Sequence, residues 1–268
     1  MSYERAPRPA LEVLSSGNAT GRPPLIFIHG GFAGAWCWEP NFLGWFAERG
    51  WECHAPSLRG HGQSEGHGDI HRFGIDDYVE DIVHLSARLA GPPILIGHSM
   101  GGFVAQRYLE RYPAMAAVLM APVPANGLVG AGVAMAANAP GLFWDVALAH
   151  EFGRRAPSPA MLFEAVFGHG PENGFSDYGE RLTDESHLAW GDMCNAGFLD
   201  TARIPDMPIK VLGGDGDRLI APAFIRSAAR QLGTQAEIMP GLGHALMLEP
   251  GWDAVADSID GWLIAQGF

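Results

Sequence analysis

The residues Gly97-His98-Ser99-Met100-Gly101-Gly102 decide how the rest of this sequence is interpreted. They follow an apolar run at 93–96 that is short enough for a buried strand. They precede residues 103–113, a stretch of good helix formers that ends at a proline. A Gly-x-Ser-x-Gly sequence between a strand and a helix is typical of a nucleophile elbow, a strained turn that exposes the serine hydroxyl. The sequence therefore predicts that Ser99 is a nucleophile in an α/β fold.

Length and composition narrow the class of protein. The chain has 268 residues, of which 47% are hydrophobic and 18% charged, enough for one large α/β domain with an insertion or for two small domains. Its net charge of −13 argues against nucleic acid and anionic membranes as partners and is compatible with a small-molecule substrate. The sequence shows no signal peptide and no apolar run near the roughly 18 residues of a membrane span. We therefore expect a cytoplasmic protein.

Short apolar runs alternate with amphipathic stretches on both sides of the elbow. Strands are expected at 10–15, 24–29, 51–56, 93–96, 116–121, 208–213 and 236–239. Helices are expected at 35–49, 76–89, 103–113, 222–232 and 251–265. This alternation predicts a mostly parallel sheet with helices on both faces.

The alternation stops after Pro122 and returns only near residue 206. The residues between carry helical patches rich in aromatic side chains, at 128–138, 141–152, 158–167 and 184–199. We expect a core formed by 1–122 and 206–268, with 123–205 as an inserted helical cap.

A serine nucleophile needs a base, and the base needs a group that orients it. His244 lies in the loop after the last expected strand, at the sheet edge where the elbow is expected. Asp215 and Asp217 both follow the strand at 208–213, and a carboxylate there can fix the tautomer of the histidine. The pattern of residues alone leaves the choice between the two aspartates open.

The order Ser…Asp…His, the elbow and the upstream sequence His29-Gly30-Gly31-Phe32 resemble the α/β-hydrolase superfamily, and in particular its serine esterases and lipases. The sequence Arg59-Gly60-His61-Gly62-Gln63-Ser64 also resembles the Arg-Gly-x-Gly-x-Ser turn of that superfamily. The resemblance covers nearly the whole chain. It implies the α/β-hydrolase fold, with the insertion at the position where members of the superfamily carry a cap.

The resemblance also implies which residues form the site. It favours Asp217, so the implied catalytic triad is Ser99, Asp217 and His244. The backbone N–H groups of Gly31 and Met100 would form the oxyanion hole, with Phe32 as an alternative to Gly31. The residues expected in the substrate pocket are Phe32, His98, Phe143, Trp144 and Trp190.

A metal site is not expected. His61, His67, Asp69 and His71 are of suitable residue types, but their spacing matches no binding pattern. The three cysteines, Cys37, Cys53 and Cys194, are too widely spaced for a zinc site or a disulfide framework. The implied reaction needs neither a metal nor a cofactor.

The predicted function is that of a serine hydrolase that cleaves a small, largely apolar carboxylic ester through an acyl-enzyme on Ser99. Carbon–carbon bond hydrolases and cofactor-free perhydrolases keep the same triad and remain alternatives. Hydroxynitrile lyases of this type use a lysine near the pocket, and residues 123–205 contain none. A non-catalytic ligand-binding receptor of the same fold is the alternative from a different class, and the complete triad favours an enzyme.

Overall fold

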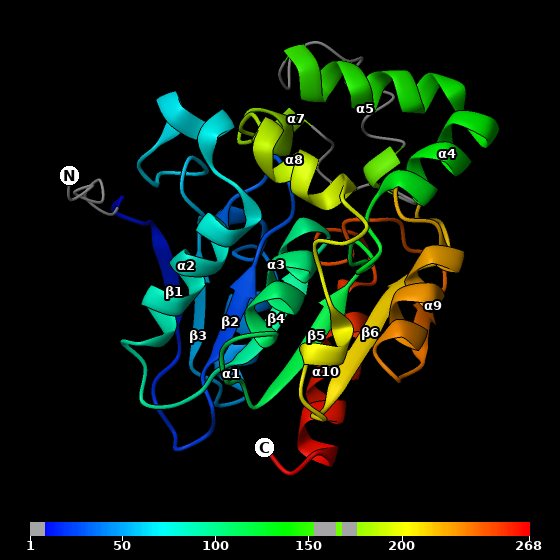
Figure 1. Ribbon diagram of the computed structural model, residues 1–268. Coiled ribbons are helices and arrows are strands. Elements are labelled where there is room, and N and C mark those ends of the chain that lie inside the picture. The colour runs from blue at the N-terminus through cyan, green and yellow to red at the C-terminus, as the bar shows by residue number, and fades with distance from the viewer. Residues whose placement is uncertain (1–8, 153–164, 168–175) are drawn as a thin grey trace.

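A seven-stranded sheet forms the centre of the computed structural model, which describes residues 9–152, 165–167 and 176–268 (Figure 1). The strand order is β1-β3-β2-β4-β5-β6-β7. The strands are β1 (Val13–Ser16), β2 (Leu25–Ile28), β3 (Cys53–Pro56), β4 (Ile94–His98), β5 (Ala116–Met120), β6 (Ile209–Gly214) and β7 (Ala236–Met239). Strand β1 pairs antiparallel with β3, and every other pairing is parallel. The predicted fold class, a mostly parallel sheet in an α/β chain, is confirmed.

Helices cover both faces of the sheet. Helices α2 (Ile75–Ser86) and α3 (Met100–Leu109) pack together on one face, and α1 (Phe42–Glu48) and α10 (Trp252–Ala265) lie on the other (Figure 1). Helix α9 (Pro222–Gln231) packs on β6 and β7. Because both faces are covered, every residue of β2, β4 and β5 is buried, as expected for the continuous apolar runs of a parallel sheet.

One expected helix is divided in two. In place of a single helix at 35–49, the chain forms a short 3-10 helix, η1 (Ala35–Cys37), followed by α1. Pro40 lies between them, and proline has no N–H to donate and restricts the residue before it. The division therefore follows from a residue that the sequence already contains.

The residues between β5 and β6, 121–208, are called here the inserted segment. It carries α4 (Val129–Asn138), α5 (Pro140–Phe152), α7 (Ser176–Gly179), α8 (His187–Cys194) and η3 (Thr201–Arg203). Its helices α4, α5, α7 and α8 lie beyond the carboxyl ends of the parallel strands (Figure 1). The helix expected at 158–167 falls mostly outside the described residues. Within the described ranges, no helix has the length and hydropathy that a membrane crossing requires.

Candidate active site

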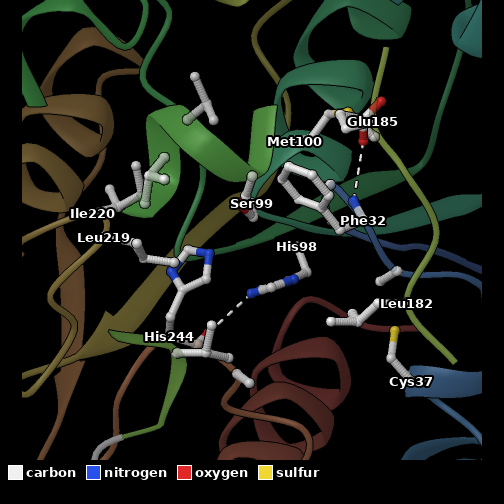
Figure 2. A pocket seen from close by; sticks show the side chains of 18 of the residues that line it. Phe32, Cys37, His98, Ser99, Met100, Leu182, Glu185, Leu219, Ile220 and His244 are labelled. Carbon is white, nitrogen blue, oxygen red and sulfur yellow. Dashed lines mark hydrogen bonds between the residues drawn. The ribbon is translucent and has the colours of Figure 1, made fainter. Parts of the chain in front are cut away.

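Ser99 follows the last residue of β4 directly and precedes the first residue of α3. Its φ of +52° lies in the left-handed region, which residues other than glycine rarely adopt. Backbone hydrogen bonds to the neighbouring strand end anchor this turn: the N–H of Ser99 donates to the carbonyl of Met120 at 2.9 Å, and its carbonyl accepts from Val123 at 3.2 Å. The sharp turn directs the serine side chain into the cavity above the sheet (Figure 2).

Glycines allow the strand and the helix to meet at this turn. A Cβ atom at Gly97 would lie 2.4 Å from the carbonyl oxygen of Gly101, and one at Gly101 would lie 2.2 Å from that of Ile28. Both distances are far shorter than atoms tolerate, and backbone atoms cannot move aside as a flexible side chain can. Glycine at these two positions is therefore a steric requirement of the elbow.

This requirement predicts a loss of stability in the Gly101→Ala variant. We expect its free energy of unfolding to fall by about 1–3 kcal/mol or more, measured as a lower urea midpoint. The matched control is Gly132→Ala in α4, where an added Cβ meets nothing within 4 Å. There we expect a gain of about 0.5–1 kcal/mol, because alanine is the better helix former. Equal midpoints in the two variants would contradict the steric argument.

His244 and Asp217 form a buried pair at the same edge of the sheet. The Nδ1 of His244 lies 2.8 Å from Oδ2 of Asp217, and the other carboxylate oxygen accepts from the backbone N–H groups of Leu219 and Ile220 at 2.9 and 2.8 Å. Because a carboxylate accepts, Nδ1 of His244 carries the proton and Nε2 is left as the basic nitrogen. The carboxylate therefore fixes both the orientation and the tautomer of the imidazole.

Asp215 has a different contact. It is exposed, and its Oδ1 accepts from the backbone N–H of Gly241 at 2.7 Å. The structure thus brings Asp217 to His244, whereas Asp215 holds the loop that follows β7.

The backbone around His244 is held independently of its side chain. Its N–H donates to the carbonyl of Val166 at 2.8 Å, and its carbonyl accepts from Nε2 of His98 at 2.9 Å. Burial, and after it the charge of a protonated His244, lowers the pKa of His98 well below the ordinary value. His98 is therefore neutral, with its proton on Nε2, and it supports the loop.

The candidate oxyanion loop, residues 30–32, lies beside the elbow. A Cβ atom at Gly30 would be 3.1 Å from the Cβ of Ser99, and Gly31, Phe32 and Met100 line the same cavity as Ser99. Met100 is the first residue of α3, so its N–H has no acceptor within the helix. The N–H of Phe32 already donates to Oε2 of Glu185 at 3.2 Å (Figure 2). Of the two expected alternatives, this contact favours Gly31 as the donor beside Met100.

Sequence reasoning missed Glu185. The side chain is buried in the wall of the cavity, where it contacts Phe32, Tyr78 and His61. Its sequence neighbourhood, in the inserted segment, resembles any solvent-exposed acidic turn. Its position depends on contacts with residues more than 100 positions away, and we find no local signal that could have identified it.

The cavity has a volume of about 210 Å³ and an apolar wall. Three of the residues expected in the pocket, Phe32, His98 and Trp190, line it. Among the described residues that complete the apolar wall are Trp36, Val123, Leu128, Met135, Phe167 and Leu219. The inserted segment therefore forms part of the wall of the cavity that Ser99 lines.

Phe143 and Trp144 are placed elsewhere. They line a second hollow, formed largely by α4 and α5, and Trp144 is 64% exposed. Helix α5 has little amphipathic character, so its apolar residues surround the helix and only some of them can face the cavity. A sequence rich in aromatic residues therefore did not indicate which of them line the cavity.

The four residues of suitable type for a metal site do not form one cluster. His61 is buried and faces Glu185, whereas His67, Asp69 and His71 are exposed on η2 (His67–Arg72). In the inserted segment, ligand atoms of His150, Glu151 and His187 lie within 4.8 Å of one another. Nε2 of His187 already bonds to the carbonyl of His150, and Glu151 and His187 are exposed.

A serine on a strained strand–helix turn, with a buried histidine–aspartate pair at the carboxyl edge of a parallel sheet, is the arrangement found in α/β hydrolases. The sequence profile described as the alpha/beta hydrolase family matches residues 25–258. The chain belongs to this family, which confirms the resemblance seen in the sequence.

Individual relatives match over most of their length. A monoacylglycerol lipase of Mycolicibacterium smegmatis is 27% identical over 237 residues, covering 82% of this chain and 81% of that protein. A non-heme haloperoxidase of Rhodococcus erythropolis is 26% identical over 257 residues, covering 88% and 90%. The crystal structure of the Paleococcus ferrophilus monoacylglycerol lipase superposes with a TM-score of 0.67 at 18% identity, covering 96% of this chain and 99% of that one.

Proposed function

We propose that this chain is a serine hydrolase that cleaves a small, largely apolar carboxylic ester through an acyl-enzyme on Ser99. The observation that carries the proposal is the hydrogen bond between Nδ1 of His244 and Asp217, together with the lining of one cavity by both His244 and Ser99. The family and the lipase relative are consistent with a carboxylic ester hydrolase. In this proposal the inserted segment acts as a cap over the site.

The proposed reaction proceeds in two stages. The Oγ of Ser99 attacks the ester carbonyl carbon while Nε2 of His244 takes its proton, and the N–H groups of Gly31 and Met100 stabilise the oxyanion. The tetrahedral intermediate collapses, the bond to the alcohol oxygen breaks, and His244 donates its proton to the leaving alcohol. Water then attacks the acyl-enzyme with His244 as base, which releases the carboxylic acid and restores Ser99.

The cavity supports a small and uncharged substrate. Its wall is apolar, and its volume of about 210 Å³ lies below the range of about 300–1,000 Å³ typical of drug-sized ligands. The net charge of −13 disfavours anionic esters through long-range repulsion. We therefore expect kcat/KM to be highest for esters of short or medium acyl chains.

Fluorophosphonate labelling followed by mass spectrometry tests this proposal. A competent site should give a single covalent adduct on Ser99, and p-nitrophenyl esters of increasing acyl length should then rank the substrates. A folded protein that gives no adduct and no turnover would count against an enzyme and in favour of a ligand-binding receptor.

Perhydrolysis is a second candidate, which the similarity to a non-heme haloperoxidase favours. Hydrogen peroxide in place of water would attack the same acyl-enzyme, release a peracid and restore Ser99. A peracid oxidises halide ions, so bromination of a reporter dye in the presence of peroxide, bromide and a carboxylic acid would detect this activity. The Ser99→Ala variant should lose it if the acyl-enzyme is involved.

The choice between the two aspartates gives a further prediction. We expect Asp217→Asn to lower kcat by about 10³- to 10⁴-fold, because an amide no longer stabilises the imidazolium or the required tautomer. Asp215→Asn is the matched control, since its carboxylate contacts a backbone N–H and not His244. It should remain within about tenfold of the wild-type kcat. Steady-state kinetics of the two variants on one ester measures both kcat values. A larger loss of kcat in Asp215→Asn than in Asp217→Asn would mean that Asp215 is the acid.

A further inference from the structure

The oxyanion loop is held from both sides by the inserted segment. Phe32 has a φ of +62°, a left-handed conformation that a non-glycine residue keeps only when its surroundings impose it. The backbone N–H of Thr183 donates to the carbonyl of Phe32 at 2.8 Å, and the N–H of Phe32 donates to Glu185 at 3.2 Å. A Cβ atom at Gly31 would lie 3.2 Å from the same carboxylate oxygen, so Glu185 packs directly against the candidate oxyanion donor.

The carboxylate of Glu185 is surrounded by donors. One oxygen accepts from the hydroxyl of Tyr78 at 3.0 Å and from the backbone N–H of Ser186 at 2.7 Å. The other accepts from Phe32 and lies 3.2 Å from Nε2 of His61. Burial, and after it the charge of Glu185, raises the pKa of Tyr78, so its hydroxyl remains a donor. All four contacts favour the ionised form of the carboxylate.

Both ring nitrogens of His61 face acceptors. Nδ1 lies 3.2 Å from the carbonyl oxygen of Arg59, and Nε2 lies 3.2 Å from the carboxylate of Glu185. A carbonyl and a carboxylate can only accept, so each ring nitrogen must carry a proton for both contacts to form. His61 is then an imidazolium, and it forms a fully buried ion pair with Glu185.

Electrostatics agrees with this geometry. Burial alone would lower the pKa of His61. The charge of Glu185, its hydrogen bond, the hydrogen bond to the carbonyl of Arg59 and the charge of Asp81 outweigh burial and raise that pKa. The ring of His29 lies 5.0 Å from that of His61, and burial followed by the charge of His61 lowers the pKa of His29 to about 3. His29 therefore stays neutral. Asp81 is itself paired with the guanidinium of Arg59 at 2.7 Å, which leaves His61 as the cation that faces Glu185.

The ion pair neutralises a negative charge next to the candidate active site. An unpaired carboxylate behind the oxyanion loop would repel the negative charge that develops on the substrate oxygen. Pairing with His61 neutralises that charge, while the carboxylate oxygen still accepts from Phe32. We propose that Glu185, paired with the imidazolium of His61, is a positioning residue that orients the oxyanion loop and thereby makes the inserted segment part of the active site. This inference rests on the proposed function.

The Glu185→Gln variant tests the inference. Glutamine keeps the size, but its amide NH2 faces one of the donors that the carboxylate accepted from, and His61 loses its counter-charge. We expect kcat on a p-nitrophenyl ester to fall by about 10- to 100-fold with little change in KM, because the displaced loop acts mainly on the transition state. The substitution does not alter Thr183, whose backbone N–H and hydroxyl both donate to the carbonyl of Phe32.

Glu110→Gln is the matched control. Glu110 is also a buried glutamate, it pairs with Arg107, and it accepts from the backbone N–H of Asp200 in the inserted segment. It does not line the cavity. A merely structural effect of losing a buried carboxylate should therefore appear in both variants as a lower unfolding midpoint, whereas the loss of kcat should appear in Glu185→Gln alone.

The charge state of His61 gives a readout that does not depend on turnover. Heteronuclear NMR of the histidine ring nitrogens should find both nitrogens of His61 protonated at neutral pH in the wild type, and one of them deprotonated in Glu185→Gln. The pKa of His61 is raised and that of Glu185 is lowered, in both cases because each charge stabilises the other against burial. The ion pair is therefore present between these two pKa values, and it is lost as the pH rises through the pKa of His61 or falls through the pKa of Glu185. The fall of kcat that accompanies deprotonation of His61 in the wild type should therefore be absent in Glu185→Gln, which has no ion pair to lose.

The outcomes separate the two proposals. A wild type with no Ser99-dependent turnover overturns the proposed function. An active wild type whose kcat is unchanged in Glu185→Gln, or a singly protonated His61 at neutral pH, overturns the positioning role while the hydrolase remains.

Discussion

Replacing Ser99 with alanine is expected to abolish ester hydrolysis, with kcat reduced by on the order of 10⁵- to 10⁶-fold. Alanine has the same Cβ atom, so it adopts the strained φ of +52° at no greater steric cost than serine, and the backbone hydrogen bonds to Met120 and Val123 remain. The substitution therefore removes the nucleophile and leaves the fold. Steady-state hydrolysis of a p-nitrophenyl ester, together with fluorophosphonate labelling, measures the effect.

Ser258→Ala is the control for this substitution. Ser258 lies on α10 and donates its hydroxyl to Glu237, and it does not line the cavity. Its variant should keep the wild-type kcat. A Ser99→Ala protein that retains activity within about tenfold of the wild type would mean that another residue carries the chemistry. Tight ligand binding without turnover in the wild type would favour the receptor alternative.

The elbow could be predicted from the sequence because it is local. The strand, the turn and the helix are contiguous, and the glycines that the close approach requires stand within two residues of Ser99. The parallel sheet could be predicted for a related reason, since its buried strands appear as uninterrupted apolar runs. The break at Pro40 was also present in the sequence, although the apolar spacing around it indicated one continuous helix.

The contacts around Glu185 could not be predicted in the same way. Its bond to Phe32 joins residues 153 positions apart, and its bonds to His61 and Tyr78 join residues 124 and 107 positions apart. Each contact exists only because the inserted segment folds back over the end of the sheet. The positions of the aromatic side chains of α5 were also not predictable, because they depend on packing and not on residue type. Phe143 and Trp144 therefore line a different hollow from the one predicted.

Replacing His244 with alanine should lower the rate of acylation about as much as the loss of Ser99, by on the order of 10⁵-fold or more. Without the imidazole, the hydroxyl of Ser99 keeps its proton and is a poor nucleophile at neutral pH. The loop should remain in place, because its hydrogen bonds to Val166 and His98 involve only the backbone of His244. An unchanged unfolding midpoint alongside lost labelling by the fluorophosphonate would separate the chemical effect from misfolding.

Two further measurements make this test specific for a base. His84→Ala removes a partly buried histidine of α2 that does not line the cavity, and it should leave the labelling rate unchanged. Free imidazole added to His244→Ala should partly restore labelling, since the deleted ring leaves space beside Ser99 and Asp217 for a base of the same shape. Activity of His244→Ala within about tenfold of the wild type would mean that His244 is not the base. Because burial lowers the pKa of His98 well below its ordinary value and its Nε2 already donates to the loop, His98 is a weak base and is not expected to take over that role.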